Sequence, residues 1–154
     1  MISTKGRYAL RVMIDLAEHM DEGYVPLKVI AERQKTSKKY LEIIIKELVN
    51  GKMVVGSSGR GGGYRLCKAP EEYTIREILE LMEGCFATVA CLASGAAPCD
   101  RAASCRTLAL WKEYDELKLR FFESKRLSDY VLKDLPEDRD RVGENCAFPH
   151  GPKR

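Results

Sequence analysis

The sequence contains no run of about 18 apolar residues, which argues against a helix that spans a lipid bilayer. Its first twenty residues, MISTKGRYALRVMIDLAEHM, have neither a long apolar stretch nor a small-residue cleavage site, so we expect no secretory signal and no membrane attachment. Histidine is scarce, with 2 residues in 154, and we recognise no Ser/His/Asp order, paired catalytic carboxylates or nucleotide-binding loop. These absences favour a cytoplasmic protein that is not an enzyme.

The net charge of +3 is unevenly distributed along the chain. Residues 1–68 contain 13 Lys and Arg against 7 Asp and Glu, whereas the remaining residues contain 13 against 16. A basic first half favours an anionic partner such as double-stranded DNA, although an excess of this size also fits an ordinary solvated surface. The spacing of the residues must decide between the two.

Three helices are predicted in the first half. Ser3 can cap a helix that reaches about Met20, and a short helix follows Pro26. Ser37 can cap a third helix, SKKYLEIIIKELVNG, whose apolar residues recur every three or four positions and which stops at Gly51. The second and third helices are close enough in sequence to form a helix-turn-helix.

A β-hairpin is predicted directly after these helices. The β-prone Met53-Val54-Val55 and the strand-like Tyr64-Arg65-Leu66 flank the Gly-rich segment GSSGRGGG. A phosphate-binding loop is the rival interpretation of this segment. It fails because no Lys-Ser/Thr pair follows the glycines and a strand, not a helix, comes next. The pattern therefore predicts a mainly α fold with a small β-hairpin wing, a winged helix-turn-helix.

The second half is predicted to be helical and to need a partner. Thr74 can cap the helix TIREILELMEG, and a longer helix from about Arg106 to Lys125 carries more apolar surface than a projecting helix can leave in water. A short helix is expected over residues 128–134. The organisation predicted is a DNA-binding domain over 1–83, a cysteine sensor loop over 84–105, a dimerisation helix region over 106–135 and a flexible tail over 136–154.

Residues that contact DNA are predicted from the geometry of a winged helix-turn-helix. The first turn of the second helix enters the major groove, where Lys38 and Lys39 would bind phosphates and Glu42 could accept from cytosine N4. A Gly-rich hairpin tip lets the backbone approach the sugar-phosphate wall, and Arg60 would reach the minor groove. The predicted DNA-contacting residues are Lys5, Arg7, Lys28, Ser37, Lys38, Lys39, Tyr40, Glu42 and Arg60.

Three cysteines, Cys91, Cys99 and Cys105, lie in the Gly/Ala-rich run CLASGAAPCDRAASC. Soft thiolates select zinc, Cu(I) or iron-sulfur clusters. Zinc is the weaker interpretation because its structural sites close four ligands, often from C-x2-C pairs, which this chain lacks. A metal or redox site with one donor missing is therefore predicted. We expect Cys67 to be in the core, and burial is the favoured interpretation for Cys85.

Several motifs together resemble the IscR-type winged-helix transcription regulators, whose relatives include NsrR and CymR. They are STKGRYAL, PLKVIAERQ, KKYLEIIIKEL in the recognition position, GGGYRL after the wing, TIREILELMEG, and the cysteine loop that leads into LALW. The resemblance covers about residues 1–135. It implies a homodimer held by the long helix over residues 106–125 and bound to partly palindromic operators.

The resemblance also implies roles for single residues. The segment YLE, which ends at Glu42, matches the family's recognition-helix pattern SYLEQ, so Glu42 takes its base-discriminating role. Lys39 and Ile43 replace the Ser and Gln of that pattern, so the operator sequence does not carry over. The family's wing Arg aligns with Ser58, which leaves Arg60 as a displaced candidate.

In IscR-type regulators the matching cysteines hold a 2Fe-2S cluster, so the resemblance implies a cluster at Cys91, Cys99 and Cys105. Some members add a His three residues after the last cysteine, where this chain has Leu108, and NsrR relatives add an Asp from the first helix, where it has Arg7. The fourth ligand stays open. The candidates are Cys85, Cys146, His150, Asp100 and an exogenous ligand.

The sequence therefore predicts a homodimeric DNA-binding transcription regulator whose DNA binding is modulated by a 2Fe-2S cluster or by the redox state of Cys91, Cys99 and Cys105. The alternative is a cluster-free regulator controlled by thiol oxidation, or by a complex with a metabolic enzyme as in CymR.

Overall fold

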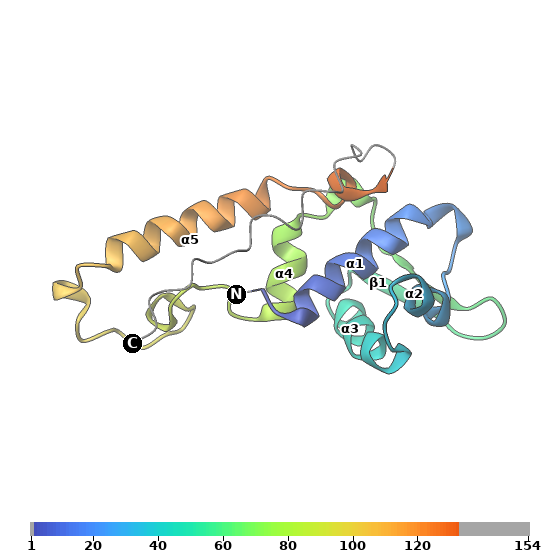
Figure 1. The fold of residues 1–154 in the computed structure, drawn as a ribbon, viewed down its shortest axis with the longest axis horizontal. Coiled ribbons are helices and arrows are strands. Elements are labelled where there is room, and N and C mark those ends of the chain that lie inside the picture. The colour runs from blue at the N-terminus through green and yellow to red at the C-terminus, as the bar shows by residue number, and fades with distance from the viewer. Residues whose placement is uncertain (1, 133–154) are drawn as a thin grey trace, which may run out of the picture.

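The computed structural model describes residues 2–132, so the predicted tail, with Cys146 and His150, lies outside the described residues. Figure 1 shows an N-terminal part, made of helices α1 to α4 and a hairpin, from which α5 extends as a long arm. No helix within residues 2–132 is long and apolar enough to cross a membrane. The elements are α1 (Thr4–Glu18), α2 (Leu27–Arg33), α3 (Lys38–Asn50), β1 (Val54–Ser57), β2 (Gly63–Leu66), α4 (Ile75–Glu83) and α5 (Leu108–Glu123).

Side-chain caps start three of the helices at the predicted residues. The hydroxyl oxygens of Ser3, Ser37 and Thr74 each accept a hydrogen bond from a backbone N–H three residues later, which satisfies a donor that the helix cannot. Several boundaries differ from the prediction, among them those of the long helix, which spans Leu108–Glu123 and not residues 106–125. The first helix ends at Glu18 and a 3-10 turn follows it, and the short helix predicted at 128–134 is a 3-10 turn over Leu127–Tyr130 in the part described.

A buried ion pair fixes the helix-turn-helix to α1. Asp15 of α1 is 2% exposed, so its carboxylate is almost completely removed from water. Arg33, the last residue of α2, donates to both of its carboxylate oxygens at 2.6 and 3.0 Å, and the Gln34 amide donates at 2.9 Å. The hydrogen bond to Asp15 raises the pKa of Arg33. This pairing satisfies the buried charge and sets the position from which α3 begins.

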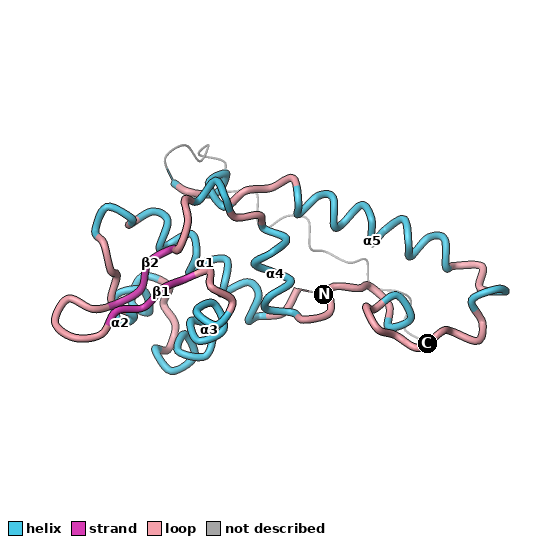
Figure 2. Tube along the Cα trace, turned by 180° about the vertical axis from the view of Figure 1, so that it is seen from behind, coloured by secondary structure: helices cyan, strands magenta, loops and turns pink. Residues whose placement is uncertain are grey.

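The hairpin is antiparallel and is attached to the chain before α2 (Figure 2). Val54 pairs with Leu66 and Ser57 with Gly63, while Val25 forms a bridge to Tyr64 with two hydrogen bonds of 2.9 Å. A Cβ at Gly63 would lie 2.4 Å from the Val25 carbonyl group, so only glycine permits this approach.

The arm formed by α5 returns to the N-terminal part. Leu127 is fully buried in the core, its N–H donates to the Tyr73 carbonyl, and the Ile75 N–H donates to the Lys125 carbonyl at 2.9 Å. By contrast, none of the described residues of α5 itself is buried. The predicted domain division remains a prediction, but the core of the N-terminal part includes a residue beyond the arm.

Candidate nucleic-acid interface and cysteine loop

The outward face of α3 is the first part of the candidate interface. Its buried stripe consists of Leu41, Ile44, Ile45 and Leu48. With 3.6 residues per turn, Lys39, Glu42, Ile43 and Lys46 then lie toward solvent, and all four are exposed. The predicted groove-entering turn is therefore free to contact a partner.

Tyr40 has a different setting from its neighbours in this turn. It is partly buried, and its ring meets that of Tyr8 edge to face, with the centroids 5.6 Å apart. Tyr40 therefore ties the start of α3 to α1 and has less surface to offer DNA than the lysines beside it.

A concave surface of about 550 Å³ lies between the first turn of α3, the start of α2 and the hairpin. It brings together predicted contact residues from separate elements. Lys28, Lys38 and Glu42 line it, together with Ser58 and Tyr64 of the hairpin region. The juxtaposition of a recognition turn and a wing is what a winged helix-turn-helix needs in order to hold a duplex.

The lysines of this surface are held only weakly. Lys38 lies 3.7 Å from Glu42 and Lys28 lies 3.9 Å from Glu32, and all four side chains are more than half exposed. Exposed pairs of this kind contribute little stability, so a phosphate can replace the carboxylate at small cost.

Two predicted contact residues lie apart from this concave surface. Lys5 pairs with Glu47 in the second half of α3 at 3.0 Å, and Arg7 donates to the Thr4 hydroxyl at 3.2 Å. Both lie near the start of α1. They do not line the surface that Lys28 and Lys38 share.

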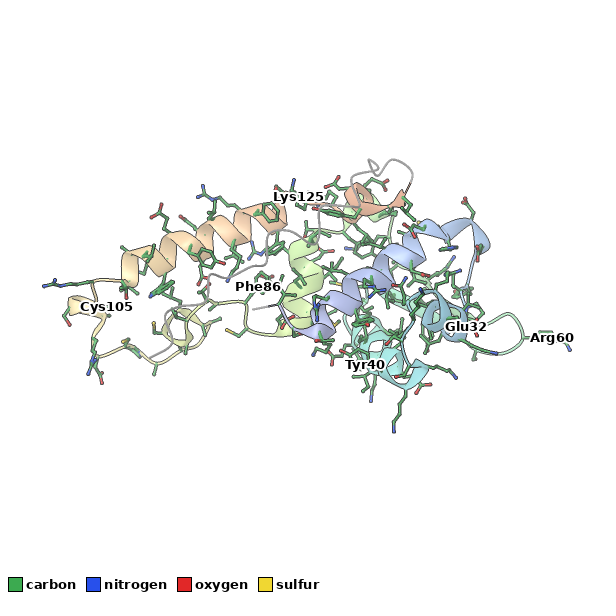
Figure 3. All side chains as sticks on the ribbon, in the orientation of Figure 1. Glu32, Tyr40, Arg60, Phe86, Cys105 and Lys125 are labelled. Atoms are coloured by element: carbon green, nitrogen blue, oxygen red, sulfur yellow. The ribbon has the colours of Figure 1, made fainter. Side chains whose placement is uncertain are left out.

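The hairpin tip projects from the N-terminal part. Figure 3 shows Arg60 at the far end of the loop, directed away from the rest of the molecule. Gly59 and Gly61, on either side of it, have φ angles of +93° and +78°, a region that L side chains rarely adopt. The glycines therefore shape a narrow tip with a single guanidinium.

Tyr73 anchors the wing, and the sequence analysis did not identify it. Its fully buried hydroxyl accepts from the N–H groups of Cys67 and Lys68 at 3.0 and 2.9 Å and donates to the Met53 carbonyl at 2.8 Å. Burial raises the pKa of Tyr73, so the proton needed for the Met53 bond is retained. A buried tyrosine requires a hydrogen-bond partner for its hydroxyl. This general requirement is the only property of the sequence that could have pointed to Tyr73 as an anchor.

The cysteine loop joins α4 to α5, and Figure 3 places Cys105 at the outer end of the arm. Cys91, Cys99 and Cys105 are exposed free thiols. Within residues 2–132, no three His, Cys, Asp or Glu side chains are close enough to hold a metal ion. Three exposed thiols in a Gly/Ala-rich loop fit an iron-sulfur cluster by donor chemistry, although the structure does not gather them.

The other described cysteines are exposed too, and both expectations of burial were wrong. Cys67 follows β2, which ends at Leu66. Since successive side chains of an extended chain face opposite sides and Leu66 is buried, Cys67 faces solvent. Cys85 follows the glycine that ends α4 and lines a cavity beside α5.

The resemblance to IscR-type regulators would place a fourth ligand at position 108 or position 7, where this chain has Leu108 and Arg7. Leu108 is the first residue of α5, and Arg7 is exposed on α1. Beside Leu108, the thiol of Cys105 lies 3.6 Å from the Thr107 hydroxyl, and this hydrogen bond lowers the pKa of Cys105. The lowered pKa favours the thiolate form of Cys105.

A polar network fastens the start of the cysteine loop to α5. Lys118 donates to the Phe86 carbonyl, to the Thr88 hydroxyl at 3.0 Å and to Asp115 at 2.8 Å. The Thr88 N–H donates to Asp115 at 3.0 Å. Partial burial raises the pKa of Asp115, but the hydrogen bonds from Lys118 and Thr88 outweigh it, so the net pKa lies below the ordinary value.

The C-terminal end of α4, where the cysteine loop begins, reaches the first helix. Glu83, its last residue, accepts from the Ser3 N–H at 3.0 Å and from the Ser3 hydroxyl at 2.8 Å. Gly6 makes room for it, because a Cβ there would lie 2.2 Å from the carboxylate oxygen. The residue before the cysteine loop is thus hydrogen-bonded to the N-terminus of α1.

An apolar stripe runs along α5 and has no cover in residues 2–132. Leu110, Tyr114, Leu117 and Phe121 recur at helical spacing and are exposed, Leu117 to 60%. A cavity of about 620 Å³ lies beside them and continues the apolar surface. A stripe of this extent marks an interaction surface.

A winged helix-turn-helix with an exposed, basic recognition turn defines a DNA-binding protein. A sequence profile of the Rrf2 family, described as iron-dependent transcriptional regulator, matches residues 2–133. The chain therefore belongs to the Rrf2 family and is a transcription regulator, not an enzyme, as the sequence predicted.

Relatives of known sequence and structure agree with this assignment. The HTH-type transcriptional regulator IscR of Aliivibrio salmonicida is 30% identical over 151 residues, which are 97% of this chain and 89% of the relative. CymR (YrzC), the global cysteine regulator of B. subtilis, is 34% identical with a TM-score of 0.68, over 84% of this chain and 94% of that one. T. potens IscR is 32% identical with a TM-score of 0.67, over 84% of each chain. The predicted fold class and the resemblance to IscR and CymR are confirmed.

Proposed function

We propose that this regulator binds a partly palindromic operator as a homodimer and that its cysteine loop modulates the binding through a 2Fe-2S cluster. The observation that carries the DNA-binding part is the concave surface shared by α3, α2 and the wing. Lys28 and Lys38 on this surface would bind phosphates. Glu42, which lines the same surface, would select a base in the major groove.

The assignments of Lys39 and Glu42 can be tested separately. Lys39→Ala should weaken binding to all duplexes by a similar factor and reduce the salt dependence by about one ion, because a phosphate contact carries no sequence information. Glu42→Ala should instead relax the preference at one base pair. Binding titrations on the promoter region at several salt concentrations measure both. An equal loss on all sequences from Glu42→Ala would refute its base-reading role.

Two further contacts complete the proposed interface. Ser37 caps α3, so the N-terminus of that helix, with its free N–H groups, can approach a phosphate. Arg60 at the wing tip would enter the minor groove, where narrow A-tracts attract guanidinium groups. Arg60→Ala should therefore reduce affinity most for operators with A-tracts flanking the major-groove site. The remaining predicted DNA contacts would be made on the side of the interface next to α1, by Tyr40, Lys5 and Arg7.

The apolar stripe of α5 supports the homodimer. A second copy of the stripe is the simplest cover for a helix none of whose described residues is buried, since a two-fold interface is self-complementary. Leu117→Glu should give a monomer that binds a full operator weakly, as measured by sedimentation velocity. Lys112→Glu, on the opposite face of α5, is the matched control and should remain dimeric. A dimeric Leu117→Glu protein would contradict this interface.

The cluster would be held by Cys91, Cys99 and Cys105, with Cys85 and Asp100 as the described candidates for the fourth ligand. When bound, a 2Fe-2S cluster would join segments of the loop that are otherwise linked only through its backbone. The hydrogen bonds that Ser3 donates to Glu83 support a route by which a change in the loop reaches the DNA-binding part.

Anaerobic reconstitution tests the cluster directly. The purified protein should acquire visible absorbance with iron and sulfide in equal amounts, and Cys→Ser at all three positions should abolish this while leaving the far-UV circular dichroism unchanged. DNA affinity measured with and without the cluster gives the coupling, for which about five- to 150-fold is typical. Protein that acquires neither absorbance nor iron at any thiol concentration would exclude the cluster.

A cluster-free regulator is the second candidate, favoured by one observation: all five described cysteines are exposed free thiols. A hydroperoxide could then convert Cys105 to a sulfenate with release of water or alcohol. Peroxide treatment of iron-free protein should change its operator affinity, and Cys105→Ser should remove the response. A metabolic-enzyme partner would instead change the affinity without any modification of the thiols, as intact mass would show.

A further inference from the structure

The recognition helix presents an isoleucine to solvent at the middle of its basic face. Ile43 is 52% exposed and lies one turn after Lys39 and just under one turn before Lys46. A single exposed apolar side chain is common on protein surfaces and means nothing alone. Its position matters here, because it follows Glu42, the proposed base-reading residue, and is flanked by two cations.

The packing of the molecule gives Ile43 no structural task. The buried stripe of α3 is formed by other residues, on the side of the helix away from Ile43, and α3 packs against α1, α2, β1 and α4. The uncovered apolar stripe belongs to α5, and Figures 1 and 2 show α3 on the side of the N-terminal part away from that arm. Dimerisation through α5 therefore leaves Ile43 exposed.

The major groove offers one apolar feature, the C5-methyl group of thymine. A β-branched side chain has a stiff χ1 in a helix, so Ile43 is a rigid apolar projection that forms no hydrogen bonds with bases. The flanking Lys39 and Lys46 would hold the helix in the groove by their phosphate contacts. The contact between Ile43 and a thymine methyl then removes apolar surface from water on both partners.

We infer that Ile43 is a specificity-determining residue that selects thymine, through its methyl group, next to the base pair read by Glu42. This inference rests on the proposed DNA-binding function and deepens it. One buried methyl group contributes about 0.8 kcal/mol, which corresponds to about a fourfold difference in affinity. The effect is expected once in each half of the operator.

Substitution of deoxyuridine for thymine provides the test, because the two bases pair identically and differ only in the methyl group. The duplex is selected from a randomised pool with the full-length protein, and each thymine is then replaced singly. The wild-type protein should lose about three- to fivefold in affinity at one thymine of each half-site. Ile43→Ala should bind the thymine and deoxyuridine duplexes equally at that position.

Val49→Ala is the matched control, since Val49 is an apolar residue of α3 that is 37% exposed near the other end of the helix. It should keep the full thymine preference. Wild-type protein that is indifferent to every replacement would overturn the inference while leaving DNA binding intact. Ile43→Ala protein that keeps the wild-type preference would overturn it as well. Failure to select any duplex would overturn the proposed function, and the inference with it.

Discussion

The close approach of α1 and α4 at Gly6 predicts that one substitution has opposite effects in two backgrounds. A Cβ on Gly6 would lie 2.2 Å from an Oε1 of Glu83, so Gly6→Ala must displace this carboxylate. The displaced group then loses its hydrogen bonds to the N–H and the hydroxyl of Ser3. In the Glu83→Ala background the Cβ meets no carboxylate.

The magnitudes follow from the contacts. Alanine in place of glycine within a helix stabilises it by about 0.5–1 kcal/mol. Loss of the two partly exposed, charge-assisted hydrogen bonds from Ser3 to Glu83 costs about 1–2 kcal/mol in total. Gly6→Ala alone should therefore lower the free energy of unfolding by up to about 1.5 kcal/mol. In the Glu83→Ala background the same change should raise it by about 0.5–1 kcal/mol.

Urea unfolding of the four proteins, followed by circular dichroism, measures this cycle. The protein concentration must be the same throughout, because dimerisation would make the midpoint depend on it. Equal effects of Gly6→Ala in the two backgrounds would refute the contact between α1 and the end of α4. A reduced operator affinity of both single variants would additionally link Glu83 to the DNA-binding part.

Three further predictions concern the other buried or networked polar groups. Asp15→Asn should lower the free energy of unfolding by about 2–4 kcal/mol, because it weakens a bidentate pair and leaves Arg33 uncompensated; a loss below about 0.5 kcal/mol in urea unfolding would contradict the pairing. Tyr73→Phe should cost about 1–3 kcal/mol and weaken operator binding, because it frees the two ends of the hairpin; unchanged affinity would show that the wing is held by other contacts. Because the pKa of Asp115 is lowered in the folded protein, this carboxylate stabilises the fold above about pH 4 and the contribution is lost as the pH falls through the folded-state pKa. Asp115→Asn should therefore make the free energy of unfolding, measured by urea unfolding, depend less on pH below about pH 4. An unchanged pH dependence would show that the Asp115 network makes no contribution to acid unfolding.

Local patterns in the sequence were sufficient for the order of the main helices and the hairpin and for the buried face of α3, although not for every boundary. Capping by Ser3, Ser37 and Thr74 and the buried stripe of α3 depend on residues within four positions of one another. The contacts of Glu83 with Ser3 join residues eighty positions apart, and no local pattern carries that information. The same holds for Tyr73, whose hydroxyl joins the two ends of the hairpin.

The cysteines show the limit of prediction from residue type. A free cysteine is small and weakly polar, so the residue type alone is compatible with the core and with the surface. Cys67 is exposed because β2 ends at the buried Leu66 and successive side chains of the extended chain face opposite sides. Cys85 is exposed because it follows the glycine that ends α4. The DNA-contacting residues remain predictions, since they depend on a partner's shape as well as on the chain.

The burial of Leu127 has a consequence for the order of events during synthesis. A chain emerging from the ribosome can form α1 to α4 early, but the hydrophobic core of this part lacks Leu127 until the cysteine loop and α5 have both been made. The whole cysteine loop is therefore synthesised before the core of the N-terminal part is complete. A chain that ends before Leu127 would therefore lack a fully buried residue of the core of its N-terminal part.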